Sequence, residues 1–299
     1  MGFDKTGLST YVANNSTEIA LKAVTKSATA ALLIANGAVQ AGIKGSEKML
    51  AMDADVVLQD GSACSRTASG TVKLIDKDLV VKPIKDVQDL CTKDLYNTYF
   101  AFNLVKGQSP EEEFTAEFSA KVMDVRAAKI AGENEKLLWQ GDTSLTGTTN
   151  MKRIDGIIKQ VGTGYTVTAS GATTVNKLQS AVLTSKIDVR SAEDFRIFVG
   201  EDVYAEYLIG LANANIYKPT SDMTIFGTTT KLEVVPGLNG IRKIFTGRIK
   251  NFRLGLDGEN DSEQASMRFS IETEKWYQDF KYALGVGVYD TSEVGVATV

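Results

Sequence analysis

The feature that most constrains this chain is a long helical pattern that runs from Ser109 to Gly141. Ser109 and Glu112 have the spacing of a capping box, Pro110 suits the first helical position, and Glu111–Glu113 lie at the positive end of the helix dipole. One apolar stripe is expected from Phe114, Phe118, Val122, Val125, Ile130, Leu137 and Leu138. At about 1.5 Å per residue the helix would be about 45 to 50 Å long, which favours an elongated scaffold over a compact enzyme.

The composition excludes several classes of function. The chain has 299 residues and a net charge of −4 at pH 7, so it lacks the basic excess of general nucleic-acid and anionic-membrane binders. Histidine is absent, which removes the commonest general base and the commonest metal ligand. The two cysteines, Cys64 and Cys91, cannot build the usual zinc site, and buried free thiols are favoured over a disulfide between them.

Motifs for targeting, catalysis and metal binding are also missing. No apolar run approaches the roughly 20 residues that span a bilayer, and the first residues carry no secretory signal, which indicates synthesis in the cytoplasm. Residues 141–150 lack the Gly-Lys-Ser/Thr ending of a phosphate loop, and no G-x-S-x-G elbow supports a Ser/Asp hydrolase. Asp53, Asp55 and Asp60 lack EF-hand spacing and fit a loop surface. We therefore predict no enzyme and no catalytic, cofactor-binding or metal-ligating residues.

The rest of the chain mixes strands and helices, which predicts an α+β fold. Two apolar runs flank a polar, turn-rich centre between Ala54 and Pro83, the pattern of a two-stranded hairpin with a long arch. Residues 266–288 predict a closing antiparallel pair that packs on the long helix, with Trp139 and Trp276 where helix and sheet meet. Further helices are expected over 17–34, 173–187 (Val175, Leu178, Val182 and Leu183 on one side) and 201–213, and a short helix or helix-like turn over 86–102. A buried strand is expected over 195–200, a strand that runs into a turn-prone loop over 231–240, and a strand pair or a strand and loop over 243–258.

Four stretches carry a resemblance to a known family: Glu135–Asp142 (EKLLWQGD), Ile154–Ile158 (IDGII), 195–211 and 266–288. Their order resembles that of the major capsid proteins of tailed bacteriophages with the Hong Kong 97-type fold, and the resemblance covers nearly the whole chain. It implies the following division: an N-terminal arm at 1–50, an extended β-hairpin loop at 51–84, a peripheral domain at 85–160 and 256–299 that contains the spine helix 109–141, and an axial domain at 161–255.

The resemblance also implies a function. The chain would be a structural protein that self-assembles as pentamers and hexamers into an icosahedral head around double-stranded DNA, without sequence-specific binding and without a membrane. Scaffolding, portal and decoration proteins are the candidate partners, and the location is the virion, assembled in the bacterial host cytoplasm. The chain has no room for a cleaved scaffolding domain, so scaffolding is separate or this is the mature form. The alternative within the same fold is an encapsulin-type bacterial nanocompartment shell.

Contacts between subunits are expected from the arm, the hairpin, the spine-helix region and the axial loop near Gly237–Gly240. An isolated hairpin has marginal stability in water and its exposed edges can pair with other chains, so we expect it to lie over a neighbouring subunit. Deleting residues 60–70 should therefore weaken assembly and leave the subunit folded. Some family members crosslink a lysine of the extended loop to a neighbour, but no feature selects one here among Lys73, Lys77, Lys82 and Lys85. A basic cluster fits strand-edge and inter-subunit salt bridges better than contacts with packaged DNA: Arg242, Lys243, Arg248, Lys250 and Arg253.

Overall fold

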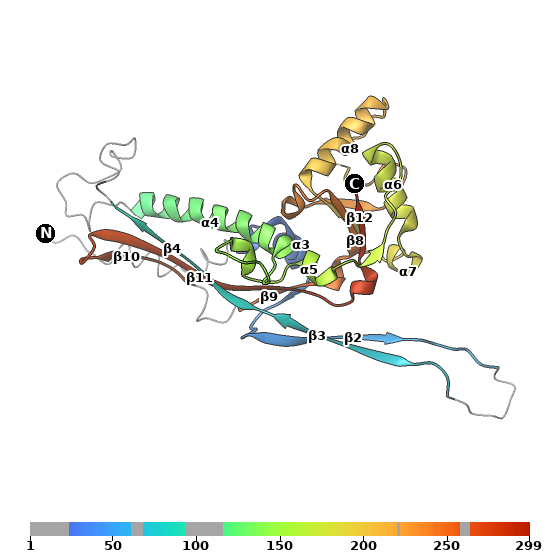
Figure 1. Ribbon diagram of the computed structural model, residues 1–299, viewed down its shortest axis with the longest axis horizontal. Coiled ribbons are helices and arrows are strands. Elements are labelled where there is room, and N and C mark those ends of the chain that lie inside the picture. Colours follow the sequence, from blue (N-terminus) through green and yellow to red (C-terminus); the bar gives the residue numbers. More distant parts are fainter. Residues whose placement is uncertain (1–23, 61–67, 92, 94–115, 220–221, 258–263) are drawn as a thin grey trace.

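The computed structural model describes residues 24–60, 68–91, 93, 116–219, 222–257 and 264–299 (Figure 1). The helices are α3 (Ala28–Ala35), α4 (Ala116–Gln140), α5 (Ile157–Val161), α6 (Thr174–Thr184), α7 (Ile187–Arg190) and α8 (Glu201–Asn213). The strands are β1 (Val39–Gln40), β2 (Ser46–Ala54), β3 (Val72–Val80), β4 (Lys82–Leu90), β5 (Tyr165–Thr166), β6 (Phe195–Val199), β7 (Lys231–Val234), β8 (Lys243–Arg248), β9 (Phe252–Leu256), β10 (Gln264–Ser270), β11 (Lys275–Val288) and β12 (Gly295–Thr298). Short 3₁₀ turns are η3 (Asn150–Lys152), η4 (Pro236–Leu238), η5 (Ile249–Asn251) and η6 (Thr291–Glu293).

The long strand β11 organises the first sheet. It pairs antiparallel with β10, β4 and β9, and β1 joins the outer side of β9. Helix α4 lies along this sheet (Figure 1) and buries Met123 and Ala127 against Met267, Trp276 and Phe280. The predicted packing of the closing pair on the long helix is therefore confirmed, and so is the position of Trp276.

Helix α4 is described from Ala116 to Gln140, so the predicted cap at Ser109 and Glu112 and the glutamates at 111–113 lie outside the described residues. The expectation that Val125 belongs to the apolar stripe is wrong, because 56% of this residue is exposed while Met123 and Ala127 are buried. The helix ends before Gly141, as predicted. A Cβ on that glycine would lie 2.5 Å from the carbonyl oxygens of Leu137 and Ile154, so the chain turns where only glycine fits.

A second sheet, in the order β5-β12-β8-β6-β7, forms a second unit, drawn at the upper right of Figure 1. Helices α6 and α8 bury side chains on one of its faces. Helix α8 begins and ends where the sequence predicts it, and strand β6 begins as predicted but ends one residue earlier, at Val199. Leu183 does not belong to the buried side of α6, because 72% of it is exposed. Strand β12 lies in this sheet, although the predicted division groups 256–299 with the spine helix.

Two other expectations about strands and helices are wrong. Residues 86–90 belong to strand β4 and not to a helix, because β4 pairs with β11 from Lys82↔Leu284 to Leu90↔Trp276 and this long pairing overrides local helical spacing. Most of the remainder of that predicted segment, 92 and 94–102, lies outside the described residues. The first strand of the hairpin is β2, whereas the apolar run at 56–58 lies beyond the strand and is exposed.

Two further predictions are only partly right. Strands β8 and β9 both exist within 243–258, but they enter different sheets and are separated by η5. The predicted N-terminal helix is present as α3, which begins after Ser27, whose hydroxyl accepts a hydrogen bond from the Ala30 amide. Residues 17–23 of that prediction lie outside the described part of the chain.

Candidate assembly surface

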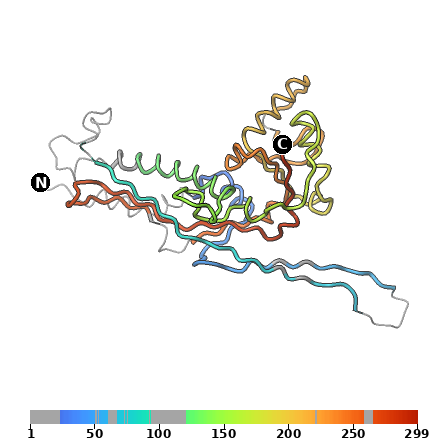
Figure 2. The backbone as a smooth tube through the Cα atoms, in the orientation of Figure 1, coloured from blue at the N-terminus to red at the C-terminus, as the bar shows by residue number. Residues whose placement is uncertain are grey.

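The hairpin β2–β3 projects from the body of the molecule (Figure 2). The strands pair antiparallel over nine residues each, from Ser46↔Val80 at the base to Ala54↔Val72 toward the tip. Figure 2 shows both strands running side by side away from the two sheets. Since directly opposed residues share a face, one face carries Leu50, Met52 and Leu74, and the other carries Met49 and Leu79.

The base of the hairpin is seated on the first sheet. Met49 and Leu79 are 2% and 0% exposed and form a small core with Val81, Ile43 and Ala283. The sheet accommodates them through two glycines of β11. A Cβ on Gly285 would lie 2.3 Å from the Val80 carbonyl oxygen, and one on Gly287 would lie 2.6 Å from the Met49 methyl carbon. The sequence GVGV in β11 therefore permits the hairpin to approach this closely.

The opposite face of the hairpin carries an uncovered apolar strip. We use this name for Leu50, Met52, Val72 and Leu74, whose exposed fractions are 68%, 71%, 65% and 68%. Met52 and Leu74 are direct cross-strand partners, so the strip is continuous. Beyond it, Val56, Val57 and Leu58 are also exposed. A contiguous apolar surface of this kind marks an interaction site.

Charged residues border the apolar strip at its base end, where Asp76 lies directly opposite Leu50 and Asp78 opposite Lys48. The Lys48 ammonium lies 3.1 Å from an Asp78 carboxylate oxygen and 3.2 Å from an Asp76 one. Hydrogen bonds to Asp78 and then to Asp76 raise the pKa of Lys48. The hairpin face is thus polar near the body and apolar toward the tip.

A buried joint at Trp139 connects the two sheets. Its ring lies 5.7 Å from Phe198 of β6, 5.5 Å from Phe245 of β8 and 6.3 Å from Phe252 of β9, centroid to centroid. Phe198 and Phe245 belong to the second sheet, whereas Phe252 belongs to the first. The prediction that Trp139 fills a core between helix and sheet is therefore confirmed.

Hydrogen bonds at this joint also hold the N-terminal helix α3. The indole of Trp139 donates to the Thr29 hydroxyl at 2.7 Å, and that hydroxyl donates to a Glu135 carboxylate oxygen at 2.6 Å. The Thr29 amide donates to the other Glu135 oxygen at 2.8 Å. Thr29 and Glu135 are each 3% exposed, so these bonds are shielded from water.

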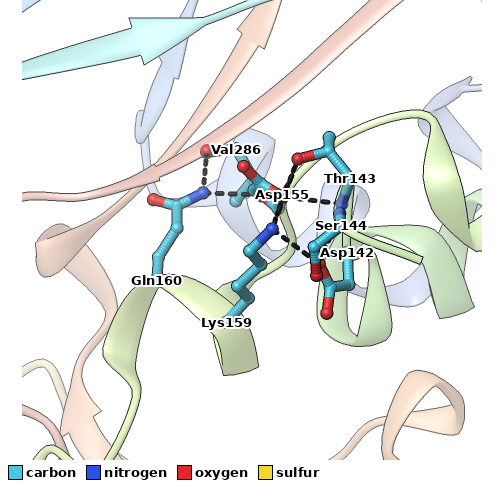
Figure 3. A network of polar contacts seen from close by, with 7 residues as sticks. All are labelled: Asp142, Thr143, Ser144, Asp155, Lys159, Gln160 and Val286. Atoms are coloured by element: carbon cyan, nitrogen blue, oxygen red, sulfur yellow. Dashed lines mark hydrogen bonds and ion pairs between the residues drawn. The ribbon is translucent and has the colours of Figure 1, made fainter.

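A second polar network lies where the spine helix ends (Figure 3). The Lys159 ammonium lies 2.5 Å from Asp142 and 2.8 Å from Asp155, and it lowers the pKa of Asp142 to about 2 together with hydrogen bonds from Ser144. Gln160 on the same helix α5 donates to the carbonyl oxygen of Val286 in β11 at 2.6 Å. The network therefore ties the turn after α4 to the first sheet through α5.

Three arginines of the predicted basic cluster are paired within the chain. Arg242 forms two bonds to Glu206, at 2.6 and 3.0 Å, and Arg248 lies 3.2 Å from Asp194. Arg253 donates to the Tyr289 hydroxyl and to a backbone carbonyl. These arginines therefore have partners within one subunit, and the inter-subunit salt bridges stay a prediction.

The predicted axial contact loop is partly wrong. Gly237 is buried, and a Cβ on it would lie 2.5 Å from the Glu135 carbonyl oxygen and 2.6 Å from the Trp139 ring. Gln140 also donates to the Gly237 carbonyl at 2.7 Å. This end of the loop therefore packs on the spine helix, and only Asn239 and Gly240 remain exposed.

Other residues considered in the sequence have simpler surroundings. Cys91 is a half-buried free thiol, whereas Cys64 lies outside the described residues. Lys82 and Lys85 are exposed on β4. Among the described residues, no group of three or more acidic, Cys or His side chains could hold a metal ion. Within the same ranges, no helix has the length and apolar character that a membrane crossing requires.

Solved structures place this architecture among known proteins. One similar structure is a chain of the satellite phage P4 procapsid, a particle whose structure includes the size determination protein. The TM-score is 0.61 and the sequence identity 10%, over 87% of this chain and 84% of that chain. The capsid of Myoviridae phage XM1 gives a TM-score of 0.56 and 14% identity over 89% and 91%. The chain has the Hong Kong 97-type capsid fold.

The capsid fold explains the arrangement of helix, sheets and hairpin, and the resemblance inferred from the order of the parts is confirmed. A virus-like particle from Pyrococcus furiosus shares it, with a TM-score of 0.51 and 10% identity over 93% of this chain and 96% of that one. No family model and no curated protein matches the sequence. At 10–14% identity the similarity is one of fold. One sequence feature that the predictions did not use is the pair of glycines Gly285 and Gly287 in β11, against which the base of the hairpin packs.

Proposed function

We propose that this chain is the major capsid subunit of a tailed phage, a structural protein without a catalytic step. In this proposal, copies assemble as pentamers and hexamers into an icosahedral head that encloses double-stranded DNA without reading its sequence. The observation that carries the proposal is the hairpin β2–β3, whose apolar strip of Leu50, Met52, Val72 and Leu74 is uncovered in one copy.

The physical argument starts from the instability of such a hairpin alone. A two-stranded ribbon is marginal in water, and exposed strand edges invite pairing with other chains. The sheet nevertheless has a site that fits this element. Strand β11 has glycine at 285 and 287, where a side chain would collide with the base of the hairpin. If the strip lies on a neighbouring copy, its apolar area leaves water, and closed symmetry multiplies this gain around the shell.

The proposal assigns parts and partners as follows. The arm (1–50), the extended loop (51–84), the peripheral domain (85–160 and 256–299) and the axial domain (161–255) keep the roles that the resemblance implies. The extended loop then starts at Ser46, where β2 begins, and the axial domain includes β12. Scaffolding, portal and decoration proteins are the proposed partners, and the proposed location is the virion, with assembly in the cytoplasm of a bacterial host.

Expression of the full chain tests the proposal. The soluble fraction is separated by sedimentation, and the fast fraction is imaged by negative-stain electron microscopy. The proposal predicts closed shells or tubes of regular diameter. A monodisperse monomer at all concentrations tested, or a chain with a measurable enzymatic turnover, would refute it.

A second candidate is an encapsulin-type nanocompartment shell, which would enclose protein cargo instead of a genome. The similarity to the Pyrococcus furiosus virus-like particle supports it, since 96% of that chain is matched. Particles isolated from the natural source separate the two candidates. Nuclease-protected double-stranded DNA inside them indicates a phage head, whereas a co-purifying protein with no protected DNA indicates a nanocompartment.

A further inference from the structure

The backbone of the hairpin crosses strand β11 at Gly285. A Cβ on this glycine would lie 2.3 Å from the Val80 carbonyl oxygen and 3.0 Å from the Val80 carbonyl carbon and the Val81 Cα. These atoms belong to the main chain, so they cannot move aside by a change of rotamer. At Gly287, on the same face of β11, the nearest atoms are the Met49 methyl carbon at 2.6 Å and the Met49 sulfur at 2.9 Å. The contact at Gly285 is thus between two backbones, whereas the contact at Gly287 is with a flexible side chain.

Both connections of the hairpin to the first sheet are short and hydrogen-bonded. Val81 alone separates β3 from β4, and the pairing of β4 with β11 begins at the next residue. The Val81 amide donates to the Gly45 carbonyl oxygen at 2.7 Å, which closes the base of the hairpin. On the other connection, the Ile43 amide donates to the Leu256 carbonyl oxygen of β9 at 3.2 Å. Both strands of the hairpin are therefore held close to the point where it crosses β11.

The side chains around this crossing are buried. Ile43, Leu79 and Val81 are 2%, 0% and 3% exposed, and they pack with Ala283 of β11. Closely packed side chains of this kind stay in single rotamers and transmit a displacement to their neighbours. A shift at the base of the hairpin is therefore passed on to the rest of it.

The apolar strip lies far from this base, so a small change at Gly285 is enlarged there. Leu74 is six residues from Val80 along β3, which is about 20 Å at about 3.4 Å per residue. An ordinary contact is about 3.4 Å long, so Gly285→Ala has to move the Val80 carbonyl group by about 1 Å. The seated base is about 10 Å long, or about three residues, so a rotation about its end moves the strip by about 2 Å.

We propose that the backbone contact at Gly285 sets the direction of the hairpin before assembly and thereby determines where the apolar strip meets a neighbouring copy. Gly285 is a positioning residue in this proposal, because it contacts the hairpin of its own subunit. The second half of the proposal deepens the proposed function and rests on it. A hairpin whose direction is already set loses less conformational freedom when it docks, which favours association.

A distance measurement in the unassembled chain tests the first half of the proposal. The chain has no histidine, so engineered histidine pairs are its only imidazole sites for Cu²⁺. One pair is Leu50→His with Met52→His, on the exposed face of β2, and it also removes half of the strip, which disfavours assembly. The other pair is Val125→His with Lys129→His, on the exposed side of α4. Pulsed electron paramagnetic resonance then gives the distance between the two copper ions in single chains.

The expected result is one narrow distance distribution, whose mean shifts by about 2 Å in Gly285→Ala. In the matched control Gly287→Ala, the Met49 side chain can move aside, so the shift should be less than half as large. A broad distribution before either glycine is replaced would overturn the proposal and needs neither variant. Equal shifts in the two variants, or no shift in Gly285→Ala, would overturn the assignment to Gly285.

Assembly of chains with an intact strip tests the second half. Both glycine variants are first shown to be folded by circular dichroism. Light scattering against concentration should then give a several-fold higher threshold for assembly in Gly285→Ala than in Gly287→Ala. Equal thresholds would overturn the connection between the direction of the hairpin and the contact with a neighbour. A parent chain that forms no particles would overturn the proposed function and leave the distance result standing.

Discussion

Replacing the cross-strand pair at the centre of the apolar strip should weaken assembly without unfolding the subunit. The change is Met52→Thr with Leu74→Thr, since threonine keeps strand propensity but removes most of the apolar surface. Burying a Leu or Met side chain completely contributes about 1.5 to 3 kcal/mol. Met52 and Leu74 are 71% and 68% exposed, so about two-thirds of that remains to be gained at a neighbour. The expected loss is therefore about 2 to 4 kcal/mol per subunit, or roughly 30- to 700-fold in the association constant.

Two measurements on the same protein check this prediction. Light scattering against subunit concentration gives the threshold for assembly, which should rise in the double variant. Urea unfolding of the unassembled chain should change by less than about 1 kcal/mol, because both side chains are already exposed. The control is Ile271→Thr, which removes an equally exposed apolar side chain away from the strip. An unchanged threshold in the double variant, or the same rise in the control, would refute the reasoning.

Three further predictions concern the fold that presents this surface. Gly285→Ala should lower the free energy of unfolding in urea by about 1 to 3 kcal/mol, because the added Cβ would lie 2.3 Å from a carbonyl oxygen. The control is Gly132→Ala in the spine helix, where the added Cβ would meet no atom within 4 Å; it should raise the free energy of unfolding by about 0.5 to 1 kcal/mol. Thr29→Val should cost about 2 to 4 kcal/mol in the same assay, because it deprives two buried groups of a partner; a loss below half a kcal/mol would contradict the joint. Asp142→Asn should lower stability above pH 4, and this effect should shrink as pH falls toward 2 and vanish below it, because the pKa of Asp142 falls from 3.8 to about 2 on folding. A pH-independent difference would contradict this assignment.

Elements with a strong local pattern could be predicted from the sequence. Helix α8 starts with acidic residues and buries one side at regular spacing, and strand β6 is a short apolar run before it, so the sequence locates the helix in full and the strand to within one residue. The closing pair β10–β11 alternates clearly and was assigned to the long helix. For these elements, local propensity, hydrophobic pattern and tertiary packing all favour the same secondary structure.

Elements whose partners are distant in the sequence could not be predicted. Residues 86–90 of strand β4 have a helical pattern, and only pairing with β11, almost 200 residues later, makes them a strand. Strand β12 at the end of the chain enters the second sheet beside β8, which no local pattern indicates. The seat of the hairpin depends on the absence of side chains at Gly285 and Gly287, and a missing side chain leaves no hydrophobic signal. The assembly surface was therefore predicted as a hairpin, but its first strand and its apolar strip were not.

A cryo-electron microscopy reconstruction of particles formed by the full chain tests the central claim most directly. The measured quantity is the position of strands β2 and β3 relative to the neighbouring copies. The account predicts a closed shell in which Leu50, Met52, Val72 and Leu74 are covered by a neighbouring copy. A shell in which this strip faces solvent, or the absence of any particle, would contradict it.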